Sequence, residues 1–114
     1  MITLYGIPNC DTVKKSRAWF DSQGLAVEFY DFKKLGVPSE AVDGWIQALG
    51  WEPLVNKKGT TWRKLDAGAQ AAVTDAASAK ALMLREPSVI KRPVVASAGQ
   101  VSVGFSPEAW ARLG

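Results

Sequence analysis

A strand, a helix and a second strand follow one another over residues 2–32, and this order constrains the fold more than any other feature. Ile2–Tyr5 is short and apolar and is followed by a glycine, which is typical of a buried strand. Residues 10–23 carry apolar side chains at helical spacing, and residues 27–32 are rich in residues that favour strands. We therefore expect two parallel strands joined by a right-handed helical crossover.

The rest of the chain supplies further helices and a hairpin. The expected elements are a helix over 39–49 with Ser39 as its N-cap, an irregular segment over 51–65 with a turn at 56–59, a helix over 74–85, a hairpin of strands 94–96 and 101–103, and a closing helix that begins at Ser106-Pro107-Glu108. This order predicts an α/β fold with a mixed four-stranded sheet flanked by helices, as in the thioredoxin-like class. We expect one domain over residues 1–114, with its core at about 1–34 and 89–114 and a helical insertion at about 35–88.

Aromatic side chains are assigned mainly to the core. Trp45 and Trp110 lie on apolar helical faces, where packing against other apolar groups is the expected role. Val13, Arg17 and Phe20 are predicted to share one face of the first helix. Trp62 falls in the irregular segment, so it is either a structural residue or part of the lining of an active cleft.

The chain contains one cysteine, Cys10, and no histidine. One cysteine cannot form an internal disulfide, and without histidine there is no Ser-His-Asp triad, no Cys-His dyad and no HExxH zinc site. We expect no bound metal or cofactor. The formal net charge of +3 and the pI of about 9.2 are compatible with an anionic substrate.

Two further classes of partner are disfavoured. No apolar run approaches the roughly 20 residues of a membrane span, and the N-terminus lacks the features of a signal peptide. The basic residues are scattered and form no recognition-helix cluster, which argues against nucleic acid. We expect a cytoplasmic protein.

Cys10 lies where the first strand leads into a helix, which is a position that activates thiols. Unpaired backbone N–H groups and the helix dipole at a helix N-terminus favour the thiolate, as do the nearby charges of Lys14 and Lys15. Thr12 is placed to donate a hydrogen bond from its hydroxyl group to the sulfur. The alternative is that Cys10 is a small buried hydrophobic residue, but its polar neighbours in a turn favour the reactive role.

A disulfide formed by Cys10 must involve a thiol from outside the chain. Val13 stands where a CxxC motif would place its second sulfur, and no other cysteine exists. Glutathione, a glutaredoxin or a second protein chain are therefore the candidate partners. Pro93 follows Arg92 and precedes a strand, and in a thioredoxin-like fold this is the place of a cis-proline whose backbone faces the active cysteine.

Four segments carry a resemblance to a known family. They are Tyr5–Lys15, Gly59–Leu65, Ile90–Pro93 and Val103–Ser106. Together they resemble the arsenate reductase C (ArsC/Spx) family, and within it the small YffB-like branch, over essentially the whole chain. The resemblance implies a thioredoxin-like fold with a helical insertion and a nucleophilic cysteine. In arsenate-reducing members that cysteine attacks arsenate held by arginines, and glutathione and glutaredoxin complete the cycle.

The oxyanion-binding residues implied by the resemblance are only partly present. Arg92 matches one of the arginines, whose paired donors suit tetrahedral oxyanions. Lys58 takes the place of a second, and Gly104 lies in the stretch where a third is expected. Gly6 stands where arsenate reducers tend to have a histidine. These departures disfavour arsenate reduction.

We therefore expect a glutathione-dependent thiol reductase in which Cys10 is the nucleophile. The residues expected to bind the substrate or stabilise the thiolate are Thr12, Lys14, Lys58 and Arg92. Two alternatives remain open. One is an arsenate reductase linked to glutathione and glutaredoxin. The other is an Spx-like transcriptional regulator that binds RNA polymerase, although Val13 replaces the second cysteine of the switch that such proteins usually carry.

Overall fold

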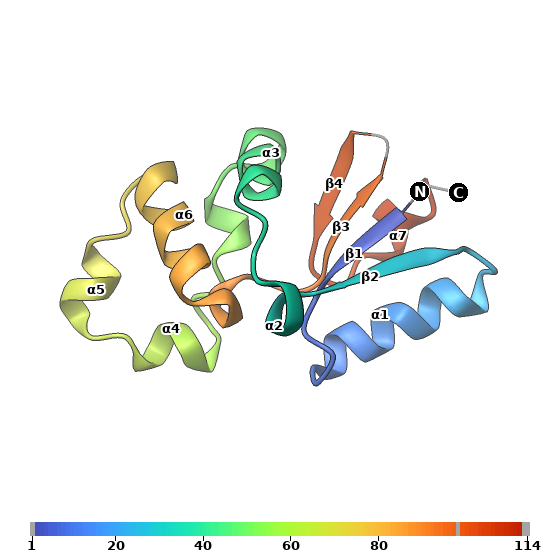
Figure 1. Cartoon of the computed structure of the whole chain (residues 1–114), viewed down its shortest axis with the longest axis horizontal. Coiled ribbons are helices and arrows are strands. Elements are labelled where there is room, and N and C mark those ends of the chain that lie inside the picture. The colour runs from blue at the N-terminus through green and yellow to red at the C-terminus, as the bar shows by residue number, and fades with distance from the viewer. Residues whose placement is uncertain (1, 98, 113–114) are drawn as a thin grey trace. The chain divides into compact units, whose positions relative to one another are not determined.

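The computed structural model describes residues 2–97 and 99–112. The chain divides into two compact units, the first made of Met1–Leu35 and Arg92–Gly114 and the second of Gly36–Lys91. The helical insertion was expected over about residues 35–88. Figure 1 shows the strands of the first unit and the short helices of the second.

The first unit is built on a mixed sheet of four strands in the order β2-β1-β3-β4. β1 (Ile2–Gly6) pairs in parallel with β2 (Val27–Asp31) and antiparallel with β3 (Val94–Ser97), which pairs antiparallel with β4 (Gln100–Val103). The helix α1 (Asp11–Ser22) connects the parallel pair. The predicted strand, helix, strand unit and the thioredoxin-like plan of the sheet are confirmed.

The strand register brings three segments to one end of this sheet. Tyr5 in β1 pairs with Val94 in β3, and Val94 pairs with Val103 in β4. The end of β1, the start of β3 and the end of β4 therefore lie in one row. The loop that leads to Cys10, the peptide before β3 and the segment after β4 meet at this end, which we call the site end of the sheet.

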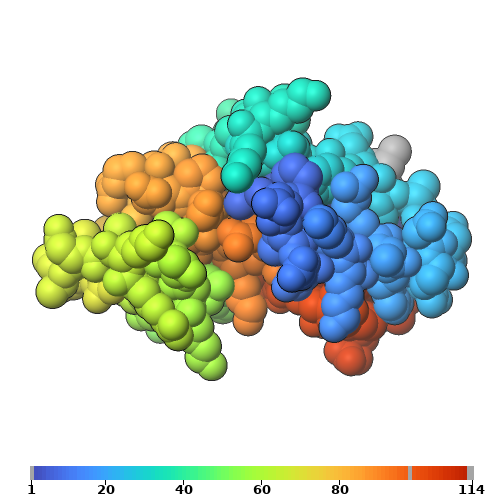
Figure 2. Space-filling model, turned by 90° about the horizontal axis from the view of Figure 1, so that it is seen from below, coloured from blue at the N-terminus to red at the C-terminus, as the bar shows by residue number. Residues whose placement is uncertain are grey.

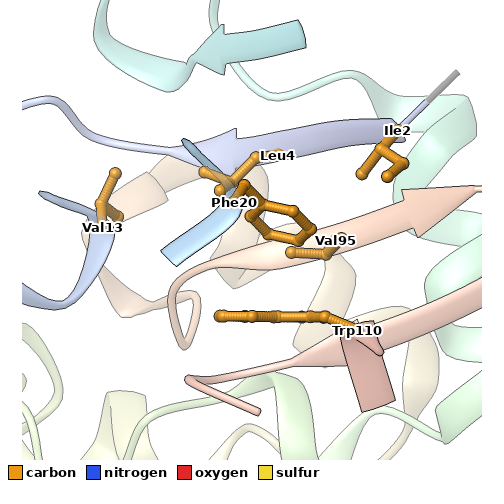
Figure 3. Close-up of a cluster of buried hydrophobic side chains, with 6 residues drawn as sticks. All are labelled: Ile2, Leu4, Val13, Phe20, Val95 and Trp110. Atoms are coloured by element: carbon orange, nitrogen blue, oxygen red, sulfur yellow. The ribbon is translucent and has the colours of Figure 1, made fainter. Parts of the chain in front are cut away.

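A buried cluster fastens α1 to one face of the sheet (Figure 3). The cluster consists of Ile2, Leu4, Val13, Phe20, Val95 and Trp110. Trp110 comes from α7 (Pro107–Trp110); its ring centroid lies 4.8 Å from that of Phe20, and its Nε1–H donates a hydrogen bond to the Ser102 hydroxyl at 3.0 Å. The predicted burial of Trp110, and that of Trp45 in the second unit, is confirmed. Because α1 is anchored along its length, its N-terminus is held in place.

Some element boundaries and faces in the first unit differ from the prediction. The second strand ends at Asp31, because its carboxylate accepts hydrogen bonds from the backbone N–H groups of Lys33 and Lys34 and so starts the short helix α2 (Phe32–Leu35). Ser16 is buried with Val13 and Phe20 in α1, whereas the Arg17 side chain is exposed. The closing helix has Ser106 at the N-cap as expected, but the Ser106 side chain makes no capping hydrogen bond.

The second unit contains only helices among its regular elements. They are α3 (Ser39–Leu49), a 3₁₀ helix (Glu52–Leu54), α4 (Thr60–Lys64), α5 (Ala67–Ala71), α6 (Ala76–Arg85) and a second 3₁₀ helix (Pro87–Val89). Residues 51–65 were predicted to be irregular, but the first 3₁₀ helix lies near the start of this segment and α4 near its end. The helix α5 was not predicted. None of the helices that the structure describes is long and apolar enough to cross a membrane.

Two helix starts in this unit were also misplaced. Pro38, and not Ser39, is the N-cap of α3, so the serine lies inside the helix and makes no capping bond. Asp75 caps α6: its carboxylate accepts from the Ser78 backbone N–H at 2.9 Å, and the Ser78 hydroxyl accepts from the Asp75 N–H at 3.1 Å. This reciprocal capping box begins the helix at Ala76 and not at residue 74. Trp62 lies in α4 and is half-buried.

Candidate active site

Cys10 occupies the N-cap position of α1. Its backbone is extended, with φ −139° and ψ 123°, and its carbonyl accepts the first helical hydrogen bond from the Lys14 N–H at 2.9 Å. Its side chain is half-buried and carries a free thiol that packs against the edge of the core cluster. The sulfur therefore lies at the helix end where backbone N–H groups have no partner within the helix.

Several groups set the pKa of Cys10, and they do not all act in the same direction. Burial is the largest single influence and raises the pKa, because it disfavours the charged thiolate. The backbone N–H of Val13, the side chain and positive charge of Arg92, and the backbone N–H of Thr12 favour the thiolate and lower the pKa. Together these groups outweigh burial and hold the pKa below its ordinary value.

Arg92 and Pro93 lie directly before β3, at the site end of the sheet. The Arg92–Pro93 peptide bond is cis, the isomer expected at this place in the fold. The carbonyl of Pro93 accepts a hydrogen bond from the Gly104 N–H at 2.8 Å, which ties this peptide to the end of β4. Arg92 is half-buried, so its guanidinium has one side on the sulfur and part of its surface open to solvent.

The predicted site residues divide between the two units. Cys10, Thr12, Arg92 and Pro93 lie together in the first unit, and Lys14 is exposed in the first turns of α1. Lys58 belongs to the second unit, where it is exposed in a turn whose geometry is fixed by the bond from its N–H to the Asn56 side-chain oxygen at 3.2 Å. A role for Lys58 at the thiol stays a prediction.

Val13 affects the thiol in a way that the sequence prediction missed. It appeared only as the residue that replaces a second cysteine, whereas its backbone N–H lowers the pKa of Cys10. The available signal was its place in the first turn of the helix, where backbone N–H groups have no partner within the helix.

Gly6 and Val13 share a space that only one side chain can fill. A Cβ atom at residue 6 would lie 2.7 Å from the Val13 Cγ2 atom, which is closer than two carbons can approach without a shift. The histidine that arsenate reducers tend to carry at this position has no room beside Val13. The thiol is therefore activated without a side chain at residue 6.

The Gly6→Ala variant tests this packing. We expect its free energy of unfolding in urea to fall by about 1–3 kcal/mol, because the added methyl group overpacks the end of β1. Gly44→Ala is the matched control: it lies within α3, its Cβ would meet nothing within 4 Å, and alanine there should be neutral or stabilising. A Gly6→Ala protein as stable as the wild type would show that Val13 moves aside at no cost.

The fold and the sequence were compared with known proteins. The model of the ArsC family matches residues 5–113. The solved structure of the YffB (PA3664) protein is 44% identical with a TM-score of 0.93, over 99% of this chain and 98% of that one. An arsenate reductase (ArsC) related protein from Brucella melitensis is also 44% identical, with a TM-score of 0.76 over 97% and 92% of the two chains. An uncharacterized protein of Haemophilus influenzae is 36% identical over 106 residues, which are 93% of this chain and 92% of its own. The chain belongs to the ArsC family.

Proposed function

We propose that the protein is a glutathione-dependent thiol reductase that uses Cys10 as its only nucleophile. The observation that carries this proposal is the environment of the sulfur. The backbone N–H of Val13, the Arg92 guanidinium and the backbone N–H of Thr12 lower its pKa, and the thiolate is the reactive form in disulfide exchange. The proposed setting is the cytoplasm, where glutathione is kept reduced.

The proposed reaction has two exchanges. The Cys10 thiolate attacks one sulfur of a disulfide, so that a bond forms between Cys10 and that sulfur while the original S–S bond breaks and the other half leaves as a thiolate that takes up a proton. A glutathione thiolate then attacks the substrate sulfur of the mixed disulfide and releases Cys10 as a thiolate. A low pKa also makes Cys10 a good leaving group in this second step.

The chain's cations would bind the carboxylates of the incoming molecules. Arg92 lies on the sulfur and has the planar fork that pairs with carboxylates, and Lys14 is exposed near the start of the same helix. Thr12 contributes its backbone N–H. Glutathione, or a glutaredoxin, supplies the second sulfur that the chain does not contain.

Arsenate reduction has weaker support. Arg92 beside Cys10 favours it, since an arginine next to the nucleophile would bind an oxyanion. Against it stands Gly104, whose φ of +83° is a conformation that residues with a side chain rarely adopt. A third arginine at this position would be strained, so the backbone there is adapted to glycine.

Reaction with oxidised glutathione tests the proposed function. We expect the native protein to form one glutathione adduct, on Cys10, that added reduced glutathione removes, as followed by intact mass. The unfolded protein in urea is the matched control, because it carries the same cysteine without its helix terminus or Arg92. Below pH 8 the native protein should react with oxidised glutathione faster than the unfolded protein does. An adduct that forms more slowly than in the unfolded chain would contradict an activated thiol.

A further inference from the structure

An exposed phenylalanine with a lysine over its ring lies at the site end of the sheet. Phe105 is 37% exposed, and its ring centroid lies 4.6 Å from the Lys15 Nζ atom. The Phe105 ring also packs against Trp110, whose ring centroid is 5.2 Å away at an interplanar angle of 85°. The buried indole therefore fixes Phe105 while its remaining surface faces solvent.

The backbone directs Phe105 toward the start of α1. Gly104 donates its N–H to the Pro93 carbonyl at 2.8 Å, and its φ of +83° turns the chain away from β4. The next residue is Phe105, which meets Lys15 in the second turn of α1. Figure 2 shows the blue start of α1 and the red segment after β4 together on one face. The pair thus lies at the same end of the sheet as Cys10 and Pro93.

No carboxylate in the described part of the chain forms an ion pair with Lys15. Its recorded contact is with the Phe105 ring. An ammonium over an aromatic ring is held by its attraction to the π-electrons, yet it keeps N–H donors for a further partner. Lys15 and Phe105 therefore present cationic donors beside an apolar surface.

We propose that Lys15 and Phe105 form a subsite for the glutathionyl half of a disulfide substrate. The ammonium would pair with a carboxylate, and the ring would pack against the methylene groups of the peptide. This inference rests on the proposed function of Cys10 and adds which half of the substrate is attacked. The Cys10 thiolate attacks the sulfur of the glutathionyl half, a Cys10–glutathione disulfide forms, and the other half leaves as a thiolate.

The test compares three disulfides that differ in charge: oxidised glutathione, which is anionic, bis(2-hydroxyethyl) disulfide, which is neutral, and cystamine, which is cationic. The rate of adduct formation on Cys10 is followed by intact mass. Lys15→Gln should slow the reaction with oxidised glutathione about fivefold, as expected for loss of an exposed ion pair. The sequence suggested that the charge of Lys15 favours the thiolate, but Lys15 is not among the groups that shift the pKa of Cys10 in the structure. The reaction with the neutral disulfide should therefore stay within about twofold of the wild-type rate. The variant's reaction with cystamine should not slow. Phe105→Ala should also slow the reaction with oxidised glutathione more than the reactions with the other two disulfides.

Two variants serve as matched controls. Arg112→Gln makes the same change of charge at an exposed residue of the first unit, and Leu84→Ala removes a hydrophobic side chain that is 38% exposed, close to the exposure of Phe105. Neither should alter the preference among the three disulfides. The melting temperature of Phe105→Ala shows whether the fold persists; Lys15 is exposed, so Lys15→Gln tests the subsite even where Phe105→Ala does not fold.

Each other outcome refutes either the subsite or the proposed function. If Lys15→Gln slows all three disulfides equally, Lys15 acts on the thiolate and the subsite is wrong. If Lys15→Gln slows none of them, the subsite is wrong as well. If the wild type forms no adduct with any disulfide, the proposed function itself fails and the subsite fails with it.

Discussion

Replacing Cys10 with serine should lower turnover in a glutathione-dependent disulfide-exchange assay by about a thousandfold or more. A serine hydroxyl stays protonated at neutral pH and forms no mixed disulfide. The chain offers no replacement, because it has neither a second cysteine nor a histidine that would activate the hydroxyl. The measurement follows oxidised glutathione as it forms, through NADPH consumption by added glutathione reductase.

The Cys10→Ser protein should remain folded, which separates chemistry from stability. Serine is a favourable N-cap residue and fits the extended backbone of this position. Its thermal unfolding should therefore resemble that of the wild type. Full turnover by a folded Cys10→Ser protein would place the nucleophile outside this chain and end the proposal of a thiol mechanism.

Replacing Arg92 with glutamine should raise the pKa of Cys10 and lower turnover at neutral pH by about ten- to a hundredfold. In the native protein the guanidinium favours the thiolate through its charge and its hydrogen bond. Without it the thiol holds its proton to higher pH, and each unit of pKa costs about a factor of ten in thiolate at pH values below the pKa. The rest of the expected decrease in turnover comes from the loss of the guanidinium that would bind the substrate's carboxylate.

The pH dependence of alkylation separates these two effects. The rate of reaction with iodoacetamide should rise with pH in both proteins, with its midpoint at higher pH in Arg92→Gln, and the two rates should approach each other where both thiols are ionised. At these pH values, any remaining difference between the two proteins in the rate of reaction with oxidised glutathione measures substrate binding. Arg112→Gln is the control for general charge. An unshifted midpoint in Arg92→Gln would contradict a role for Arg92 in activating the thiol.

The sheet could be predicted from the sequence because its strands are short, apolar and separated by clear breaks. The parallel pair and the hairpin follow from the order of their segments. The helices α4 and α5 could not be predicted in the same way, since five residues are too few for a helical hydrophobic repeat. The only local signal for α5 is Asp66, whose carboxylate accepts from the Ala69 N–H at 2.7 Å.

Side-chain burial in α1 shows a second limit of sequence patterns. Arg17 has the spacing of a buried residue, but its guanidinium lies outside, 4.4 Å from the centroid of the Phe29 ring. Ser16 is buried instead, because its hydroxyl donates to the Thr12 carbonyl at 2.6 Å and so leaves no unpaired polar group in the core. A polar residue that satisfies itself within the helix does not stand out in a pattern of hydrophobicity.

The candidate site was predictable where it depends on residue type and not where it depends on the backbone. Cys10 was named because a thiol at a helix start is visible in the sequence, and Arg92 because it matches an arginine of the family that the sequence resembles. A backbone N–H is present in every residue except proline, so the sequence does not show that the N–H of Val13 lowers the pKa of Cys10.

The contact between residues 6 and 13 also bears on how this chain could change its chemistry over evolutionary time. Val13 Cγ2 is the atom that blocks a side chain at Gly6, and residue 13 is where a second thiol would stand. Exchange of valine for cysteine removes one of the two branches and opens space beside residue 6. The acquisition of an internal disulfide partner and the acquisition of a side chain at residue 6 are therefore linked steps, and we expect the two positions to vary together among descendants of this protein.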